Sequence, residues 1–187
     1  MRVIVEPYNP QWASDFLKIK SDLTEALKAT SYISIEHVGS TSVPGLAAKP
    51  IIDIDIIVKR HDVEGAIDAC TTAGYDYMGE WGIPDRHALR APSNLPVRNL
   101  YVCVEGCLAL RNHIAVRDLL KADAGLRDEY AAVKFELADR DVADVDEYCD
   151  GKNKVLGKIL KRAGILREEL DSVEQMNTGH HTNVVHS

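Results

Sequence analysis

The sequence predicts an α/β (α+β) fold in which helices flank a small mixed β-sheet and a helical part follows toward the C-terminus. Three observations support this prediction. The run 51–58, Ile-Ile-Asp-Ile-Asp-Ile-Ile-Val, has the density of branched apolar residues that is typical of an interior strand. Apolar residues recur at helical spacing before this run, over about 10–29. They do so again in several segments after residue 109.

The first elements are a short strand, a helix and a second strand. Residues 2–6 have the composition of a strand. Asn9 is expected to cap the next helix and Pro10 to open it, because proline suits the first helical position. Residues 32–38 are β-like, and Gly39 breaks the pattern that they form.

The central strand over 51–58 is followed by a predicted helix over 62–73, which ends at Gly74. Residues 75–89 contain several turn residues and fit either a hairpin or a loop over a site. A further strand is expected over 99–104, so the sheet draws its strands from the first 108 residues.

From residue 109 onward the pattern is helical. Helices are expected over 109–122 and 126–139, with a break near Gly125. A last helix is expected over 153–163, where the apolar residues form one stripe.

A chain of 187 residues is expected to form a single domain, which here spans 1–171. Within it, about 1–108 would form the sheet-containing core and about 109–171 the helical part. Residues 172–187 are polar and lack periodicity, so we expect a flexible tail there.

The composition restricts the classes of partner. The chain has 22 Lys+Arg and 29 Asp+Glu, a net charge of −7, whereas a sequence-independent grip on nucleic acid needs a basic face. Its apolar runs are too short for a transmembrane helix, and a charged residue comes too early for a signal peptide. We therefore expect a cytoplasmic protein that binds neither nucleic acid nor membrane and keeps its four cysteines as reduced thiols.

Two acidic residues interrupt the central strand. Asp53 and Asp55 fall on one face of it, because side chains alternate along a strand. Buried carboxylates are costly without partners, and two that lie close together repel each other. A divalent cation resolves both problems, and Mg²⁺ (or Mn²⁺) prefers such oxygen ligands and shares itself with substrate phosphates. The alternative is that both acids face solvent near a strand end.

The segment Gly39-Ser40-Thr41 precedes these acids. Glycine lets the backbone approach a phosphate closely, a turn exposes N–H groups, and the two hydroxyls add donors. Most Gly-Ser pairs are plain turns. Here, however, twelve residues separate Ser40 from the Asp53-x-Asp55 motif, and the combination is more informative than either part.

The combination resembles the motif of the nucleotidyltransferase superfamily, in which hydrophobic-Gly-Ser precedes Asp-x-Asp on a strand. More narrowly, residues 35–54 are similar to the diagnostic segment of the GrpB family (UPF0157), and the similarity continues in order over about 5–163. Supporting segments are Pro7-Tyr8-Asn9-Pro10-x-Trp12, Gly82-Ile83-Pro84, Asn99-Leu100-Tyr101-Val102-Cys103, Arg111-Asn112-His113 and Tyr148-x-x-Gly151-Lys152. The resemblance implies a nucleotidyltransferase-like fold and a reaction class, without naming a substrate.

The resemblance also implies roles for individual residues. Gly39 and Ser40 would hold the terminal phosphates of a nucleotide. Asp53 and Asp55 would bind one or two metal ions, which would align an acceptor hydroxyl for attack on the α-phosphorus as pyrophosphate leaves.

A third carboxylate usually lies on a neighbouring strand in such enzymes. Here that position is Tyr101, a poor Mg²⁺ ligand, which weakens the case for the two-metal reaction. Glu36 is a candidate substitute as a metal ligand. Its alternative is an acid at the surface or in an ion pair.

Other basic residues are candidate contacts for phosphate. The candidates are Lys49, Arg86 and Lys152. For the two lysines, a solvent-exposed side chain without a role in binding is an equally good interpretation. His113 and Arg117 are one helical turn apart and either line the cleft or pair with neighbouring acids.

The function predicted from these features is that of an Mg²⁺-dependent nucleotidyltransferase, which moves a nucleoside monophosphate from a nucleoside triphosphate to a small-molecule or protein acceptor. One alternative is a catalytically inactive nucleotide-binding sensor or adaptor, which Tyr101 favours. The other is a metal-dependent phosphohydrolase that uses water as the acceptor.

Overall fold

The computed structural model describes residues 4–92, 96–139 and 145–164. The described elements are, in order, α1 (Gln11–Ala26), β1 (Ser34–Val38), the short 3₁₀ helix η1 (Ser40–Ser42), β2 (Ile52–Val58), η2 (Arg60–Asp62), α2 (Val63–Thr72), β3 (Asp76–Gly79), β4 (Arg86–Arg90), β5 (Arg98–Val104), α3 (Leu108–Ala122), α4 (Ala124–Asp139) and α5 (Val145–Arg162).

The strands form one sheet in the order β1-β2-β5-β4-β3. β2 and β5 run parallel, and the other neighbouring pairs are antiparallel. The predicted mixed sheet with flanking helices is therefore confirmed. β2 lies inside the sheet, with a strand on each side, as its run of branched apolar residues predicts.

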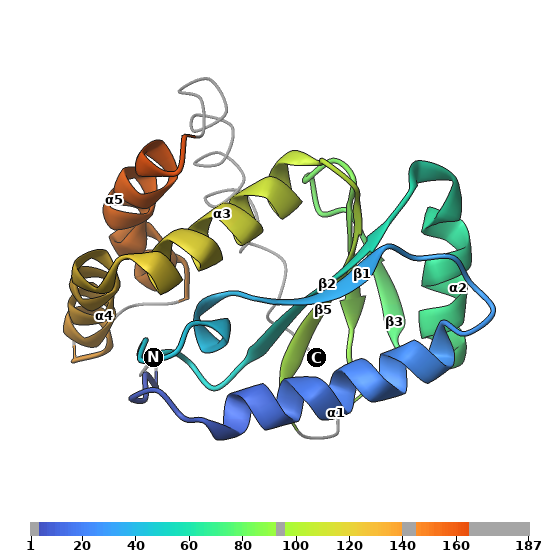
Figure 1. The fold of residues 1–187 in the computed structure, drawn as a ribbon, viewed down its shortest axis with the longest axis horizontal. Helices are drawn as coiled ribbons and strands as arrows, with labels where there is room; N and C mark the ends of the chain where they lie inside the picture. The colour runs from blue at the N-terminus through green and yellow to red at the C-terminus, as the bar shows by residue number, and fades with distance from the viewer. Residues whose placement is uncertain (1–3, 93–95, 140–144, 165–187) are drawn as a thin grey trace.

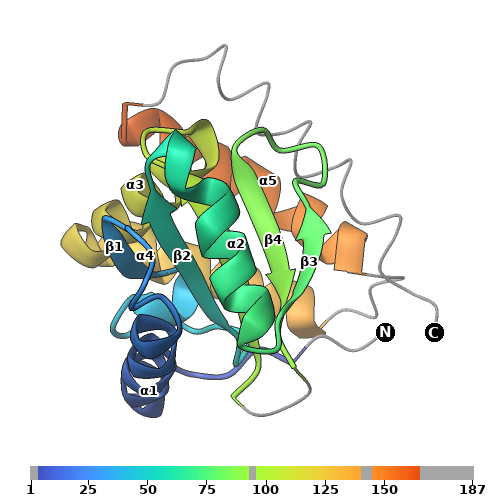
Figure 2. The same cartoon turned by 90° about the vertical axis from the view of Figure 1, so that its right-hand side faces the viewer.

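One face of the sheet forms the main core with α1 and α2. Ile54 and Ile56 of β2 are fully buried there, beside Leu23 of α1 and Ala66 of α2. Burying each large aliphatic side chain stabilises the fold by about 1.5–3 kcal/mol, so this face holds most of the hydrophobic stabilisation. Figure 2 shows α2 in front of the sheet from this side.

The other face is covered by the helical C-terminal part. α3 contacts β1 and β5, while α4 and α5 pack on α3 and on each other. A second apolar cluster, which includes Leu120, Tyr130 and Ile159, joins these helices. Figure 1 shows α3, α4 and α5 grouped apart from α1 and α2. The aspartates of β2 face this helical side, so the helices form a wall of the candidate site.

The N-terminal strand prediction is wrong for the described residues. Between residues 4 and 6 the chain makes one isolated bridge, in which Glu6 and Ala48 exchange two backbone hydrogen bonds of 2.9 Å. Residues 2 and 3 lie outside the described part. Pro7 follows directly and has no N–H to extend the ladder. The helix begins at Gln11, one residue later than predicted, although Oδ1 of Asn9 accepts the N–H of Gln11 at 2.9 Å.

The last helix starts earlier than expected, at Val145 instead of 153. Its first turns lack the apolar stripe that identified 153–163, so the pattern could not show them. Gly151 lies within these turns, and a Cβ there would be 2.4 Å from Cδ2 of Leu137. Glycine thus lets α5 approach α4 closely. The tail predicted over 172–187 lies outside the described residues.

The ambiguous segment 75–89 forms a hairpin, β3 and β4, with a bulge between Tyr77 and Gly79. Among the described cysteines, Cys70, Cys103 and Cys107 are free thiols. No helix in the described ranges has the length and apolar character needed to cross a membrane.

Candidate functional site

The two acids of β2 lie on the helical face of the sheet. Sheet register places Glu36 of β1 directly beside Asp55 on one side and Tyr101 of β5 on the other. Asp53 is likewise in register with Asn99 of β5. Because residues two apart on a strand share a face, these side chains form two adjacent polar rows on one face of the sheet. One row crosses β1, β2 and β5, and the other crosses β2 and β5.

A neighbouring side chain contacts each aspartate. Nδ2 of Asn99 donates to Oδ1 of Asp53 at 2.8 Å, and Nδ1 of His113 on α3 lies 2.7 Å from Oδ2 of Asp55. Asp55 is fully buried, and its Oδ1 has no hydrogen-bond partner among the described residues. A buried acceptor without a partner is costly, so this oxygen indicates a missing ligand.

The Gly39–Ser40 turn packs directly against Asp53. Gly39 has φ +67° and ψ −172°, a region that essentially only glycine occupies. A Cβ at Gly39 would lie 2.1 Å from Oδ2 of Asp53. The turn and the carboxylate are therefore in direct contact, and glycine is required for that contact.

A buried lysine, which the sequence did not predict as a site residue, donates hydrogen bonds to the Gly39–Ser40 turn and to the segment that follows it. Lys134 of α4 is 3% exposed, and its Nζ donates to Oγ of Ser40 and, at 3.0 Å, to the carbonyl of Ala47. The same ammonium lies 4.3 Å from the ring centroid of Tyr130. The available signal was a lysine on the apolar stripe of α4, where a buried charge is expensive.

Tyr101, in register with Asp55, has two side chains around it. The guanidinium carbon of Arg86 lies 4.6 Å from the Tyr101 ring centroid, and the ring of His113 lies 6.2 Å from it. Burial raises the pKa of Tyr101 to about 12, so its hydroxyl stays protonated. For His113, burial lowers the pKa, but the adjacent Asp55 carboxylate outweighs that and leaves the pKa raised.

Glu36 is engaged in an ion pair on the opposite side of Asp55. Nη1 of Arg117 donates to Oε2 of Glu36 at 2.8 Å and to the carbonyl of His37 at 3.2 Å. The hydrogen bond from Arg117 lowers the pKa of Glu36 despite its partial burial. Glu36 would have to leave Arg117 to ligate a metal.

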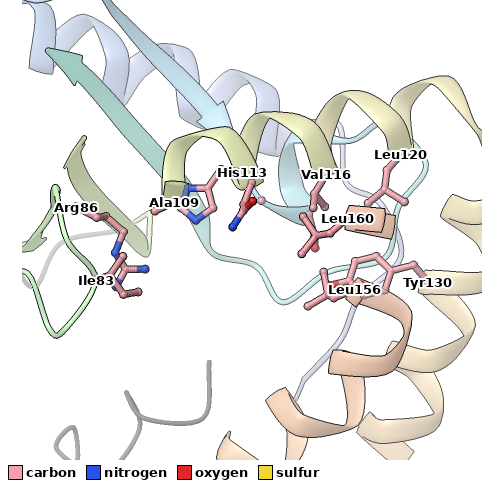
Figure 3. A pocket seen from close by; sticks show the side chains of 12 residues that line it. Ile83, Arg86, Ala109, His113, Val116, Leu120, Tyr130, Leu156 and Leu160 are labelled. Atoms are coloured by element: carbon pink, nitrogen blue, oxygen red, sulfur yellow. The ribbon is translucent and has the colours of Figure 1, made fainter. Parts of the chain in front are cut away.

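A cavity of about 190 Å³ adjoins the Gly39–Ser40 turn and His113, and Asp53 and Asp55 lie behind these residues and are not part of its lining. The polar residues of its lining, together with Gly39, are Ser40, Arg86, Asn112 and His113. Its apolar end is lined by Val116 and Leu120 of α3, Tyr130 of α4, and Leu156 and Leu160 of α5. Figure 3 shows α3 along one wall, with Arg86 and Ile83 at one end and the α4 and α5 side chains at the other.

The remaining predicted phosphate contacts are less directly placed. The hydroxyl of Thr41 is buried and donates to the carbonyl of Ile51 at 3.0 Å, so it holds the turn in shape. Lys49 is half-buried and does not line the cavity. The side chain of Lys152 lies outside the described part.

Comparison with known proteins identifies the family. The family model described as GrpB protein matches residues 2–162. The chain belongs to the GrpB family. A UPF0157 protein of Streptomyces coelicolor is 36% identical over 170 residues, which cover 89% of this chain and 87% of that protein. The UPF0157 protein YqkA of Bacillus subtilis is 34% identical, and the matched region spans 79% of this chain but only 43% of YqkA.

Two solved structures extend the comparison to the fold. A crystal structure of the conserved protein GrpB from Enterococcus faecalis has a TM-score of 0.75 and 31% identity, and it covers 91% of this chain and 99% of that one. The Cid1 poly(U) polymerase, determined as a mutant bound to MgATP, has a TM-score of 0.52 at 14% identity, over 72% of this chain and 44% of that one. The GrpB chain therefore has a nucleotidyltransferase-like fold.

Proposed function

We propose that this GrpB protein binds a nucleoside triphosphate with Mg²⁺ and transfers its nucleoside monophosphate to a hydroxyl of a small-molecule or protein acceptor. The observation that carries the proposal is the buried Oδ1 of Asp55, which has no partner among the described residues. A cation would satisfy this oxygen and would also relieve the repulsion between Asp53 and Asp55.

The donor set fits a divalent cation. Asn99 and His113 each hold one oxygen of an aspartate, so the carboxylates of Asp53 and Asp55 are oriented as ligands usually are by their neighbours. Mg²⁺ commonly uses one or two carboxylates and completes its shell with water and phosphate. Asp53 and Asp55 would hold it, and when bound it would neutralise phosphate charge and polarise the transferring phosphoryl group.

The groups around the turn are suited to a triphosphate. Gly39 lets a phosphate oxygen approach the backbone, and the hydroxyl of Ser40 lines the cavity. Lys134 adds a buried positive charge beside Ser40, and Arg86 adds a guanidinium to the lining of the cavity. The overall charge of −7 favours an acceptor other than nucleic acid. The likeness in fold to a polymerase determined with MgATP supports the same class of ligand.

Tyr101 favours a second candidate function, nucleotide binding without transfer. In that case the protein would act as a sensor or adaptor, because the acid that usually helps to position a second metal is absent from β5. One assay separates the candidates. Each of the four α-labelled ribonucleoside triphosphates is incubated with the protein and Mg²⁺, once with a pool of small metabolites and once with a pool of proteins as acceptors.

Transfer predicts labelled acceptor together with pyrophosphate, and the phosphohydrolase alternative predicts free labelled monophosphate. Binding without either product would support the sensor and contradict transfer. Lys134→Met should reduce triphosphate affinity by about tenfold or more, since it removes a charge-assisted contact. The matched control is Lys158→Met, because Lys158 is exposed on α5 and pairs with Glu129 away from the cavity. Equal affinity in both variants would argue against a triphosphate at the Gly39–Ser40 turn.

A further inference from the structure

We propose that the site holds a single divalent cation and that the guanidinium of Arg86 stands where a second cation would otherwise act. This inference rests on the proposed function, because it assumes a cation at Asp53 and Asp55. It concerns the side of Asp55 that faces β5 and β4, where the third acid of a two-metal site would lie.

The residue next to Asp55 on β5 is not an acid. Tyr101 is in register with Asp55 on the parallel strand β5, on the same face of the sheet. Its side chain is a half-buried phenol and not a carboxylate. A neutral phenol offers Mg²⁺ none of the anionic charge that a carboxylate would supply.

A positively charged side chain, Arg86, already lies against Tyr101. The guanidinium of Arg86 lies over the Tyr101 ring, 4.6 Å from its centroid, and Arg86 lines the cavity. Its Nε is buried and has no hydrogen-bond partner among the described residues. A buried donor of this kind indicates a missing acceptor, and the planar guanidinium matches the oxygens of a phosphate.

On the β1 side of Asp55, Glu36 does not replace the missing third acid. Glu36 is bound to Arg117 at 2.8 Å, and Arg117 also ties β1 to α3. Within the described ranges, no third His, Cys, Asp or Glu side chain joins Asp53 and Asp55 in a group placed to hold a metal, so this part of the chain offers two carboxylates and no more. Paired metals in such sites lie about 3.5–4 Å apart. A second dication there would face the positive charge of Arg86 without an acid to offset it.

The test counts metal ions instead of turnover. Mn²⁺ binding per chain is measured by equilibrium dialysis with the non-hydrolysable α,β-methylene analogues of ATP, GTP, CTP and UTP. Electron paramagnetic resonance then reports whether bound Mn²⁺ ions are isolated or magnetically coupled as a close pair. The wild-type protein should show isolated Mn²⁺ at Asp53 and Asp55, lost in Asp53→Asn. A coupled pair in the wild type would overturn this inference and leave the proposed function intact. No protein-bound Mn²⁺ would overturn both.

A designed variant provides the reciprocal result. Tyr101→Asp combined with Arg86→Gln restores an acid and removes the competing cation, so it should acquire a coupled pair. Tyr77→Asp is the matched control, because Tyr77 is exposed on β3 and should keep isolated Mn²⁺. A folded double variant without a coupled pair would contradict the inference. If circular dichroism shows that this variant is unfolded, the wild-type spectrum decides. Arg86→Gln alone should weaken analogue binding about tenfold or more while leaving Mn²⁺ isolated.

Discussion

The contact between Gly39 and Asp53 gives the sharpest test of the site geometry, through the substitution Gly39→Ala. The backbone at Gly39 has φ +67° and ψ −172°, where a residue with a Cβ is strained by about 1–3 kcal/mol. The added Cβ would also lie 2.1 Å from Oδ2 and 2.9 Å from Cγ of Asp53. The carboxylate must therefore move, and its 2.8 Å hydrogen bond from Asn99 would be disturbed.

The two effects can be separated by a double-mutant cycle. Gly39→Ala should cost about 1.5–6 kcal/mol in the wild-type background, combining the strain with a contact term of about 0.5–3 kcal/mol. In an Asp53→Ala background Oδ2 and Cγ are absent, so the contact term should largely disappear. Gly74→Ala is the control, because Gly74 has φ +95° but no atom within 4 Å of its Cβ position.

The assay is equilibrium unfolding in urea, followed by circular dichroism, for the single and double variants. Thermal midpoints provide a second readout, since 1 kcal/mol shifts the midpoint by about 2–4 °C for a chain of this size. The reasoning is refuted if Gly39→Ala costs the same with and without the Asp53 carboxylate, or if it costs no more than Gly74→Ala.

Two further predictions concern stability. Burial lowers the pKa of His37 from 6.5 to about 4. The unfolded chain therefore binds a proton that the fold rejects between these values, and stability falls as pH drops from about 6.5 toward 4, by up to ~3 kcal/mol. His37→Phe, which can keep the stack on Phe16, should show a smaller loss in urea unfolding at stepped pH; an identical pH profile would contradict this. Arg117→Ala should cost about 1–3 kcal/mol by leaving Glu36 without its partner, whereas Asp118→Ala, at an exposed acid, should stay within about 0.5 kcal/mol; equal costs would contradict the role of Arg117.

The sequence predicts best those features that a single segment determines. The strand over 51–58 is found at Ile52–Val58, because burial on both faces leaves a dense run of branched residues. The segment that forms the hairpin of β3 and β4 fits either a hairpin or a loop by its sequence, since a bulge and turn residues hide the alternation of its strands. The early start of α5 was missed because its first turns lack an apolar stripe.

The site was predictable only where one motif contains the residues. Gly39 and Asp53 belong to that motif and lie in contact, and the register places Tyr101 beside Asp55. Lys134 reaches Ser40 from 94 residues further along the chain, and its position depends on how α4 packs against the turn. No local pattern encodes that packing, although a lysine within an apolar stripe marks an unusual burial.

The most direct test of the central claim is thermal unfolding of the protein with ATP, GTP, CTP and UTP, each with and without Mg²⁺. The variants are Asp53→Asn and, as a control, Asp68→Asn at an exposed position on α2. A nucleotide at 100 times its Kd should add about 2.7 kcal/mol of stability, a midpoint shift of roughly 5–11 °C. The account predicts such a shift for at least one nucleotide, dependent on Mg²⁺, kept in Asp68→Asn and lost in Asp53→Asn. The absence of any shift in the wild type, or its persistence in Asp53→Asn, would contradict a nucleotide and metal site at these residues.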